Sequence, residues 1–338
     1  MQKRPLYFKE TKAVPAPLAV PIPIADLERY AQDWLFDGEY RNQSRCTING
    51  KRDVTSKLLW FLRHRDYDSC STTELRQFLA YVATGHEEKG GRWGKAHLTN
   101  AVSSRTLKAY YIYLQGFFRW SVAEGLIPQS PLERIPAPIA RSQQVQGFTR
   151  EQIQALVQAA RHTTHPNRDV AIIWFLYDTG IRASELCGLR LNDLDLSGRS
   201  CIIQKGKGGK RRTVHLGRVT AKSVWNYLRE QPREGNDPVF ISDRGTRSCE
   251  QLTRSGLLQL IERLGKAASV RGKCSPHVFR HTFAVEFLRN GGHIYALKEL
   301  LGHNSLHMCS RYIALASSDM ANQHKMHSPA DRLGARVE

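Results

Sequence analysis

Acidic residues are scarce in this chain, and long apolar runs are missing. Its 338 residues include 50 Lys and Arg but only 31 Asp and Glu, a formal net charge of +19, and its isoelectric point is near 9.9. No run of eighteen apolar residues occurs, which excludes a transmembrane helix. Four prolines interrupt the apolar stretch near the N-terminus and no small-residue cleavage site follows it. We therefore expect an extended arm over residues 1–23 and no signal peptide.

The sequence also lacks the marks of a disulfide framework, a zinc ribbon or a P-loop. Its seven cysteines are scattered, odd in number and without a CxxC pair, which is typical of a protein kept in a reducing compartment. The phosphate-binding pattern GxxxxGK followed by Ser or Thr is absent.

Positive charge is abundant, and it favours a polyanionic partner such as DNA or RNA. A ribosome-associated protein or a merely basic enzyme is the alternative. With an apolar share of 41%, 338 residues are enough for two domains that each bury a core. We expect a two-domain cytoplasmic protein, associated with the nucleoid of a bacterium or archaeon.

The first half, residues 24–127, is predicted to be an all-helical domain. Apolar residues recur there at three- and four-residue spacing, and Ser or Thr precedes several of the runs as an N-cap. The expected helices cover residues 26–38, 55–65, 72–85 and 103–125. The loop at 86–98 is glycine-rich and basic, so it either follows a phosphate backbone or is a plain solvated loop.

Prolines and polar residues over 128–147 predict a linker, and a second domain follows over 148–317 with a polar tail over 318–338. Thr149 and Gln152 form a capping box at its start. The pattern predicts a mainly α domain with a small β-sheet, because a glycine-rich hairpin at 197–217 interrupts a series of helices. These helices are expected over residues 148–162, 169–180, 219–231, 249–268, 276–291 and 294–302.

Two segments of the second domain carry cations that suit phosphate binding. In TGIRASEL, Arg182 stands at the start of a helix whose Leu186 and Leu189 face inward; its alternative role is an ion pair with Glu185. In KGKGGKRR, glycines let backbone amides approach phosphate while amines add charge. One lysine there could also be the general acid for a departing alkoxide, or all the basic residues could only bind the backbone. These residues are Lys205, Lys207, Lys210, Arg211 and Arg212.

Histidines recur at helical spacing near the C-terminus. HVFRH places His277 and Arg280 on one face of a helix, with His281 one turn from His277. HNSLH repeats the spacing at His303 and His307. With Cys274 and Cys309 nearby, a zinc site is the rival interpretation, although Val278 replaces a metalloprotease glutamate and Arg280 would bring a cation to the metal. Core hydrogen bonding fits His281 and His307 better than His277 and His303.

A tyrosine completes the set of candidate residues. Tyr312 is expected on a short helix in LHMCSRYIALASS, packed down by apolar neighbours while its phenol projects. Attack at neutral pH needs cations that stabilise phenolate character, or a nearby base. Guanidiniums grip phosphate oxygens bidentately and imidazoles move protons, so the set suits phosphoryl transfer.

In order and spacing, TGIRASEL, SPHVFRHTFA, LGHNSL and RYI resemble the motifs of the tyrosine recombinases, the integrase family that includes phage integrases and Xer resolvases. The resemblance covers most of 148–317; the first half is similar by position and pattern only. It implies a helical SAM-like core-binding domain followed by a mixed α/β catalytic domain of the DNA breaking-rejoining type.

The resemblance further implies strand exchange through a covalent 3′-phosphotyrosyl link, with no ATP, metal or other cofactor. Tyr312 would attack, Lys207 would protonate the leaving 5′-oxygen unless Lys205 or Lys210 replaces it, and His277 would assist proton transfer. Charge on the nonbridging oxygens would be stabilised by Arg182, Arg280 and His303.

The implied partner is double-stranded DNA, clamped by two domains within a homotetramer that a C-terminal segment helps to join, with accessory DNA-bending proteins. A type IB topoisomerase and a non-catalytic DNA-binding protein on the same fold are the alternatives. The sequence leaves open whether the chain serves a mobile element or resolves chromosome dimers.

Overall fold

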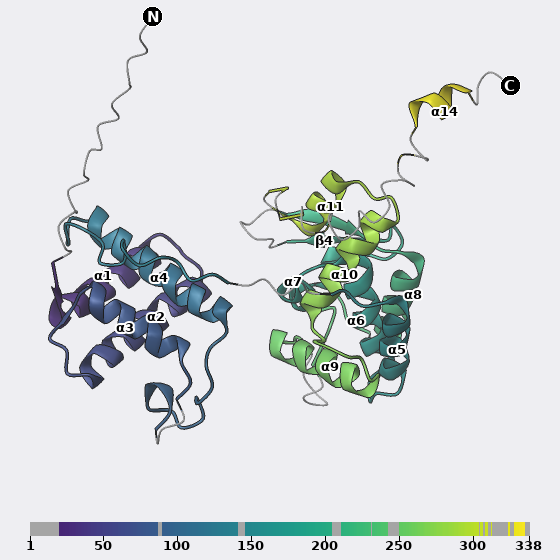
Figure 1. The fold of residues 1–338 in the computed structure, drawn as a ribbon. Helices are drawn as coiled ribbons and strands as arrows, with labels where there is room; N and C mark the ends of the chain where they lie inside the picture. Colours follow the sequence, from purple (N-terminus) through teal and green to yellow (C-terminus); the bar gives the residue numbers. More distant parts are fainter. Residues whose placement is uncertain are drawn as a thin grey trace, which may run out of the picture. The chain divides into compact units, whose positions relative to one another are not determined.

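A computed structural model describes residues 20–86, 90–140, 146–204, 211–230, 232–242, 250–303, 305–306, 308–309, 312, 324 and 328–334. The chain divides into two compact units, residues 1–143 and 144–338 (Figure 1). None of the helices described has the length and apolarity needed to span a bilayer.

Unit 1 is a four-helix domain, as the sequence predicts. Its helices α1 (Ile24–Tyr40), α2 (Arg45–His64), α3 (Thr72–Ala83) and α4 (Ser104–Ala123) pack on one another around a single apolar core. The 3₁₀ turn η1 (Arg92–Gly94) precedes α4, and β1 (Ile22–Pro23) pairs antiparallel with β2 (Ser69–Cys70).

Serine caps begin three of these helices. Ser71 and Glu74 form a capping box at α3, and Ser103 accepts a hydrogen bond from the backbone of Thr106 at 3.2 Å. Helix α2 begins ten residues earlier than predicted, at the Ser44 cap. Its first turns are mostly polar and bury few apolar side chains, so apolar spacing alone does not reveal them.

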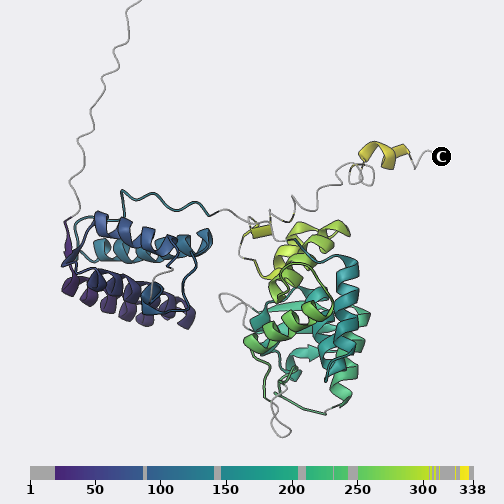
Figure 2. The same cartoon turned by 60° about the horizontal axis from the view of Figure 1, so that its bottom comes forward.

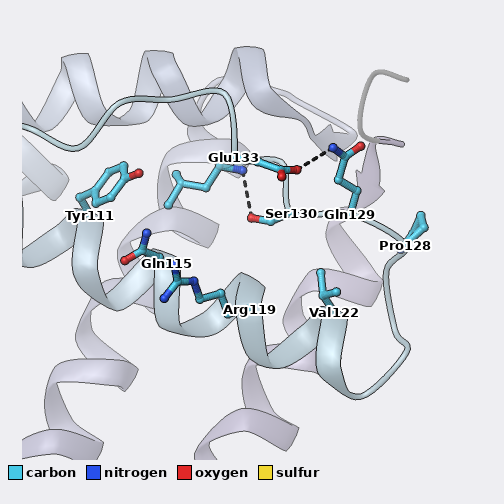
Figure 3. Close-up of a pocket in the computed structure, with 9 residues that line it drawn as sticks. Tyr111, Gln115, Arg119, Val122, Pro128, Gln129, Ser130 and Glu133 are labelled. Carbon is cyan, nitrogen blue, oxygen red and sulfur yellow. Dashed lines mark hydrogen bonds between the residues drawn. The ribbon is translucent and has the colours of Figure 1, made fainter. Parts of the chain in front are cut away.

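Two segments predicted as arm and linker belong partly to unit 1. Ile22 is buried and pairs with Cys70, so the arm ends before it. Leu132 and Ile135 are buried in the same core, and the Tyr111 hydroxyl donates to the carbonyl of Ile135 at 2.8 Å. A cavity of about 520 Å³ lies between the start of the predicted linker and α4. Figure 3 shows residues that line it from both sides, such as Ser130 and Glu133 from the linker and Arg119 from α4. The predicted linker is therefore packed against unit 1 at least as far as Ile135.

Unit 2 is mainly helical with a small antiparallel sheet, as predicted. Its helices are α5 (Arg150–Arg161), α6 (Pro166–Thr179), α7 (Ala183–Gly188), α8 (Arg218–Glu230), α9 (Arg254–Ala267), α10 (Pro276–Arg289), α11 (Ile294–Leu301) and the short α14 (Pro329–Gly334). The strands β3 (Leu194–Asp195), β4 (Ser200–Ile203) and β5 (Arg212–His215) are ordered β3-β4-β5, and η2 (Leu191–Asp193) precedes them. The hairpin β4-β5 is the predicted one; β3 was not predicted.

Helix α6 is the centre of unit 2. It contacts α5, α8 and α10, and the same elements are seen from another side in Figure 2. The predicted capping box of Thr149 and Gln152 begins α5. Phe148, one residue earlier, packs on Phe279 and donates its backbone N–H to the hydroxyl of Thr282 at 2.8 Å. The first residues of the unit are thereby fixed to α10.

Candidate active site

The turn after α6 places Arg182. Gly180 ends the helix with φ +58, and a side chain there would collide with the ring of Phe283. The following Ile181 is fully buried, which anchors the turn, and Arg182 becomes the N-cap residue of α7. The predicted inward positions Leu186 and Leu189 are buried.

A buried carboxylate joins two arginines. The side chain of Glu185 is 2% exposed, and it accepts bonds from the Arg182 backbone N at 2.8 Å and Nη1 at 2.7 Å. Arg212 of β5 grips both carboxylate oxygens, at 2.9 and 2.7 Å. Burial alone would raise the pKa of Glu185, but the hydrogen bonds from Arg212 and Arg182 hold that pKa below its ordinary value.

Arg280 of α10 is the third guanidinium. It is buried, and it donates to the carbonyl of Gly180 at 2.9 Å and to that of Leu301 at 2.6 Å. Burial, and then the positive charge of Arg182, lower the pKa of Arg280 to about 10. The group therefore stays charged at neutral pH.

Three successive carbonyls at the end of α11 accept from these three arginines. Arg212 Nε donates to Leu300 at 2.9 Å, Arg280 to Leu301, and Arg182 Nη2 to Gly302 at 3.0 Å. The last carbonyls of a helix have no partner within it and carry its negative dipole end. The end of α11 thus gathers the cations, and His303 follows directly.

His303 and Tyr312 lie together in the core of this region. The Nδ1 atom of His303 is 3.0 Å from the Cys309 thiol, and its ring is 6.4 Å from the Tyr312 ring, nearly parallel at 12°. The His281 ring lies 5.3 Å from Tyr312. Tyr312 is 0% exposed, so the expectation that its phenol projects is wrong: the ring lies in an apolar cluster with Leu297 and Leu301, beside the imidazoles of His281 and His303.

The other predicted residues fall into three groups. His277 is exposed near the start of α10, and Arg211 is exposed beside β5. Outside the described residues lie Lys205, Lys207, Lys210 and His307. Arg212, expected on the DNA backbone, instead bonds to Glu185 and Leu300 with a side chain 11% exposed.

The sequence offers the ion pair between Arg182 and Glu185 only as an alternative to a functional role for Arg182. The structure contains the pair, and it is part of the arginine cluster. The contact of Cys309 with His303 has no sequence signal. Among the described residues, no group of three or more His, Cys, Asp or Glu side chains is arranged to hold a metal ion.

Comparison with known proteins identifies the same family that the sequence motifs resemble. Residues 146–319 match the model of the phage integrase family. The chain is similar to the tyrosine recombinase XerA of Thermococcus kodakarensis, with 33% identity over 73% of this chain and 86% of that protein. It is 26% identical to the tyrosine recombinase XerC of Bacillus pumilus over 86% of this chain and 92% of that one. This second match extends well into unit 1.

A solved structure shares the fold. The integrase of the Tn1549 transposon, in complex with circular intermediate DNA, superposes with a TM-score of 0.66 at 18% identity. The match covers 89% of this chain and 98% of that one. Together with the convergence of two arginines, a histidine and a tyrosine at the end of α11, these matches show that the chain belongs to the phage integrase family, the tyrosine-type site-specific DNA recombinases.

Proposed function

We propose that this recombinase breaks and rejoins double-stranded DNA through a covalent bond between Tyr312 and a 3′-phosphate. One observation carries the assignment. Arg182 and Arg280 donate to adjacent carbonyls immediately before His303, whose ring faces Tyr312. Four residues from three distant segments thus meet in one region, with the chemical groups that phosphoryl transfer needs.

The reaction is a transesterification in which one bond to phosphorus replaces another. The Tyr312 oxygen forms a bond to phosphorus while the bond from phosphorus to the 5′-oxygen breaks. The phenol proton passes to a base, for which we propose His277, and the leaving oxygen takes a proton from Lys207, or from Lys205 or Lys210 in its place. The ester bond energy is retained in the phosphotyrosine, so the 5′-hydroxyl of another strand can reverse the step.

The charges of the site favour the transition state over the ground state. Arg182, Arg280 and His303 would donate to the nonbridging oxygens, where negative charge grows as Tyr312 attacks. One carboxylate, Glu185, neutralises only part of the charge of the arginine cluster. The excess is positive, as an anionic substrate requires.

Tyr312 is enclosed in this structure, so its attack needs a rearrangement. We propose that the phenol reaches the phosphate once DNA is bound, and that the site is assembled on the substrate. The solved Tn1549 integrase, which shares the fold, is itself in complex with DNA.

The proposed function also implies how the protein contacts DNA and assembles with other proteins. We propose that the domain over 24–127 and the catalytic domain over 148–317 both bind the duplex, and that Lys205, Lys210 and Arg211 add backbone contacts. Arg212 was expected with them, but its internal bonds argue for another role. We also propose a homotetramer on paired sites, aided by DNA-bending proteins and located at the nucleoid.

The replacement Tyr312→Phe tests the nucleophile. We expect this variant to keep its affinity for DNA, because it retains the aromatic ring and loses only the hydroxyl, and to form no covalent adduct with a nicked suicide duplex. Adducts are measured as slow-migrating bands on a denaturing gel, and DNA binding is measured separately by anisotropy.

Tyr227→Phe is the matched control, because Tyr227 is a buried tyrosine of the same unit, stacked on Phe240. It should form the adduct at the wild-type rate. An adduct with Tyr312→Phe would show that another residue attacks.

A further inference from the structure

We propose that Arg212 is a positioning residue of this recombinase: through Glu185 and the end of α11 it holds the Arg182 guanidinium in the orientation that binds the scissile phosphate. The proposal rests on the function proposed above and adds a third arginine to the site. Arg212 itself need not touch DNA.

The hydrogen bonds of Arg212 all go to other groups of the protein, as expected of a residue that positions its neighbours. Its two terminal nitrogens grip the two oxygens of Glu185, and its Nε donates to the carbonyl of Leu300 at 2.9 Å. All three nitrogens of the guanidinium are therefore committed within the protein. This planar, bidentate arrangement fixes orientation in a way that a single ammonium cannot.

Arg182 is the more accessible of the two arginines on Glu185. Its side chain is 25% exposed, against 11% for Arg212. Arg182 Nη1 uses one carboxylate oxygen, and Nη2 uses the carbonyl of Gly302. The difference in exposure indicates two roles. Arg182 can meet a phosphate at the surface, while the less exposed Arg212 holds both oxygens of Glu185.

The end of α11 shows why the support is needed. Burial lowers the pKa of Arg280, and the positive charges of Arg182 and Arg212 lower that pKa further, because like charges this close together repel one another. The carbonyls of Leu300, Leu301 and Gly302 and the carboxylate of Glu185 offset this repulsion. Loss of Arg212 would leave Glu185 bound from one side only, so Arg182 and Glu185 could turn together away from the phosphate.

Gly302 leaves room for the Arg212 guanidinium at the end of α11. Its φ is +61, in the left-handed region, and a side chain there would lie 3.1 Å from Arg212 Nη1. A residue larger than glycine would press directly on the supporting guanidinium. The left-handed backbone at the helix end therefore favours glycine at position 302, and the close approach of Arg212 adds to that preference.

The test compares cleavage of two substrates by Arg212→Ala and Arg212→Lys. One nicked suicide duplex carries an ordinary scissile phosphodiester, and the other carries a methylphosphonate, which has no charge on its nonbridging oxygen. On the phosphodiester we expect Arg212→Ala to slow single-turnover adduct formation by about 10- to 100-fold, the usual effect of removing a residue that orients a reacting group. Arg212→Lys should fall between Arg212→Ala and wild type.

On the methylphosphonate most of the difference between variant and wild type should disappear, because there is no charge left for Arg182 to neutralise. The ratio of the two rates is measured on one preparation, so a smaller folded fraction cancels. Arg289→Ala is the matched control, since it breaks an Arg–Glu pair of 3.1 Å on the surface of α10, where the Arg289 side chain is 51% exposed.

Two outcomes would overturn the proposal. Wild-type cleavage of the phosphodiester by Arg212→Ala would show that Arg182 needs no support. Equal slowing on both substrates would show that Arg212 serves only the fold. If the wild-type protein forms no adduct at all, the proposed function itself fails, which is a separate and visible result.

Discussion

The replacement Glu185→Gln would leave the arginine cluster without its buried anion. The carboxylate accepts four bonds, two from Arg182 and two from Arg212, at 2.7 to 2.9 Å. The amide retains the shape of the side chain but has no charge and turns an NH₂ group toward a guanidinium.

The size of the effect follows from the burial of the pair. Removing one partner of a buried ion pair costs about 3–5 kcal/mol, because the remaining charge stays uncompensated. In a domain of 150 to 250 residues, 1 kcal/mol corresponds to roughly 2–4 °C in Tm, so we expect unit 2 to unfold about 6–20 °C lower. Differential scanning calorimetry can follow the transition of this unit.

The pH dependence gives a sharper check. The pKa of Glu185 is lower in the folded protein than in the unfolded chain. Its charge therefore stabilises the fold above the unfolded pKa of about 4.3, and this contribution is lost as the pH falls further. The difference between wild type and Glu185→Gln should be largest near neutral pH and shrink in acid. Equal stability at pH 7, or a difference that does not change in acid, would refute the reasoning.

Two further predictions concern backbone and thiols. Gly180→Ala should lower the free energy of unfolding, measured in urea, by more than Gly235→Ala does. Both glycines have a positive φ, which costs an alanine about 1–2 kcal/mol. Of the two, only Gly180 lies so close to a side chain, that of Phe283, that a new methyl group would collide with it. Equal losses would mean that Phe283 yields freely. Among the six cysteines that the structure describes, only Cys46 is exposed, and burial raises the pKa of Cys187 to about 11 and that of Cys201 to about 12. A thiol reagent should therefore modify Cys46 in the native protein and the other five only on unfolding, as read by peptide mass spectrometry; native labelling of Cys201 would contradict this.

The long amphipathic helices could be predicted because their apolar spacing is a local signal. The capping box of Thr149 and Gln152 was equally visible. The strand β3 was not, since two residues carry no alternating pattern. Leu132 and Ile135 are buried by helices that lie far from them in the sequence. Their local sequence, which is rich in proline, indicates only a linker.

The candidate site was predictable in its chemistry and less so in its arrangement. Arg182, Arg280 and His303 were expected to act together, and the structure brings them to one helix end. The support by Arg212 was missed, because it joins residues 27 and 88 positions apart. The roles of Lys207 and His277 stay predictions.

The burial of Tyr312 has a consequence for how this protein can change over evolutionary time. The ring is 0% exposed in a cluster with Leu297 and Leu301, so position 312 is held by packing as well as by chemistry. A descendant that gave up strand cleavage would still need an aromatic ring there. Phenylalanine fills the same space, and we expect it at this position in relatives that have kept the fold and lost the reaction.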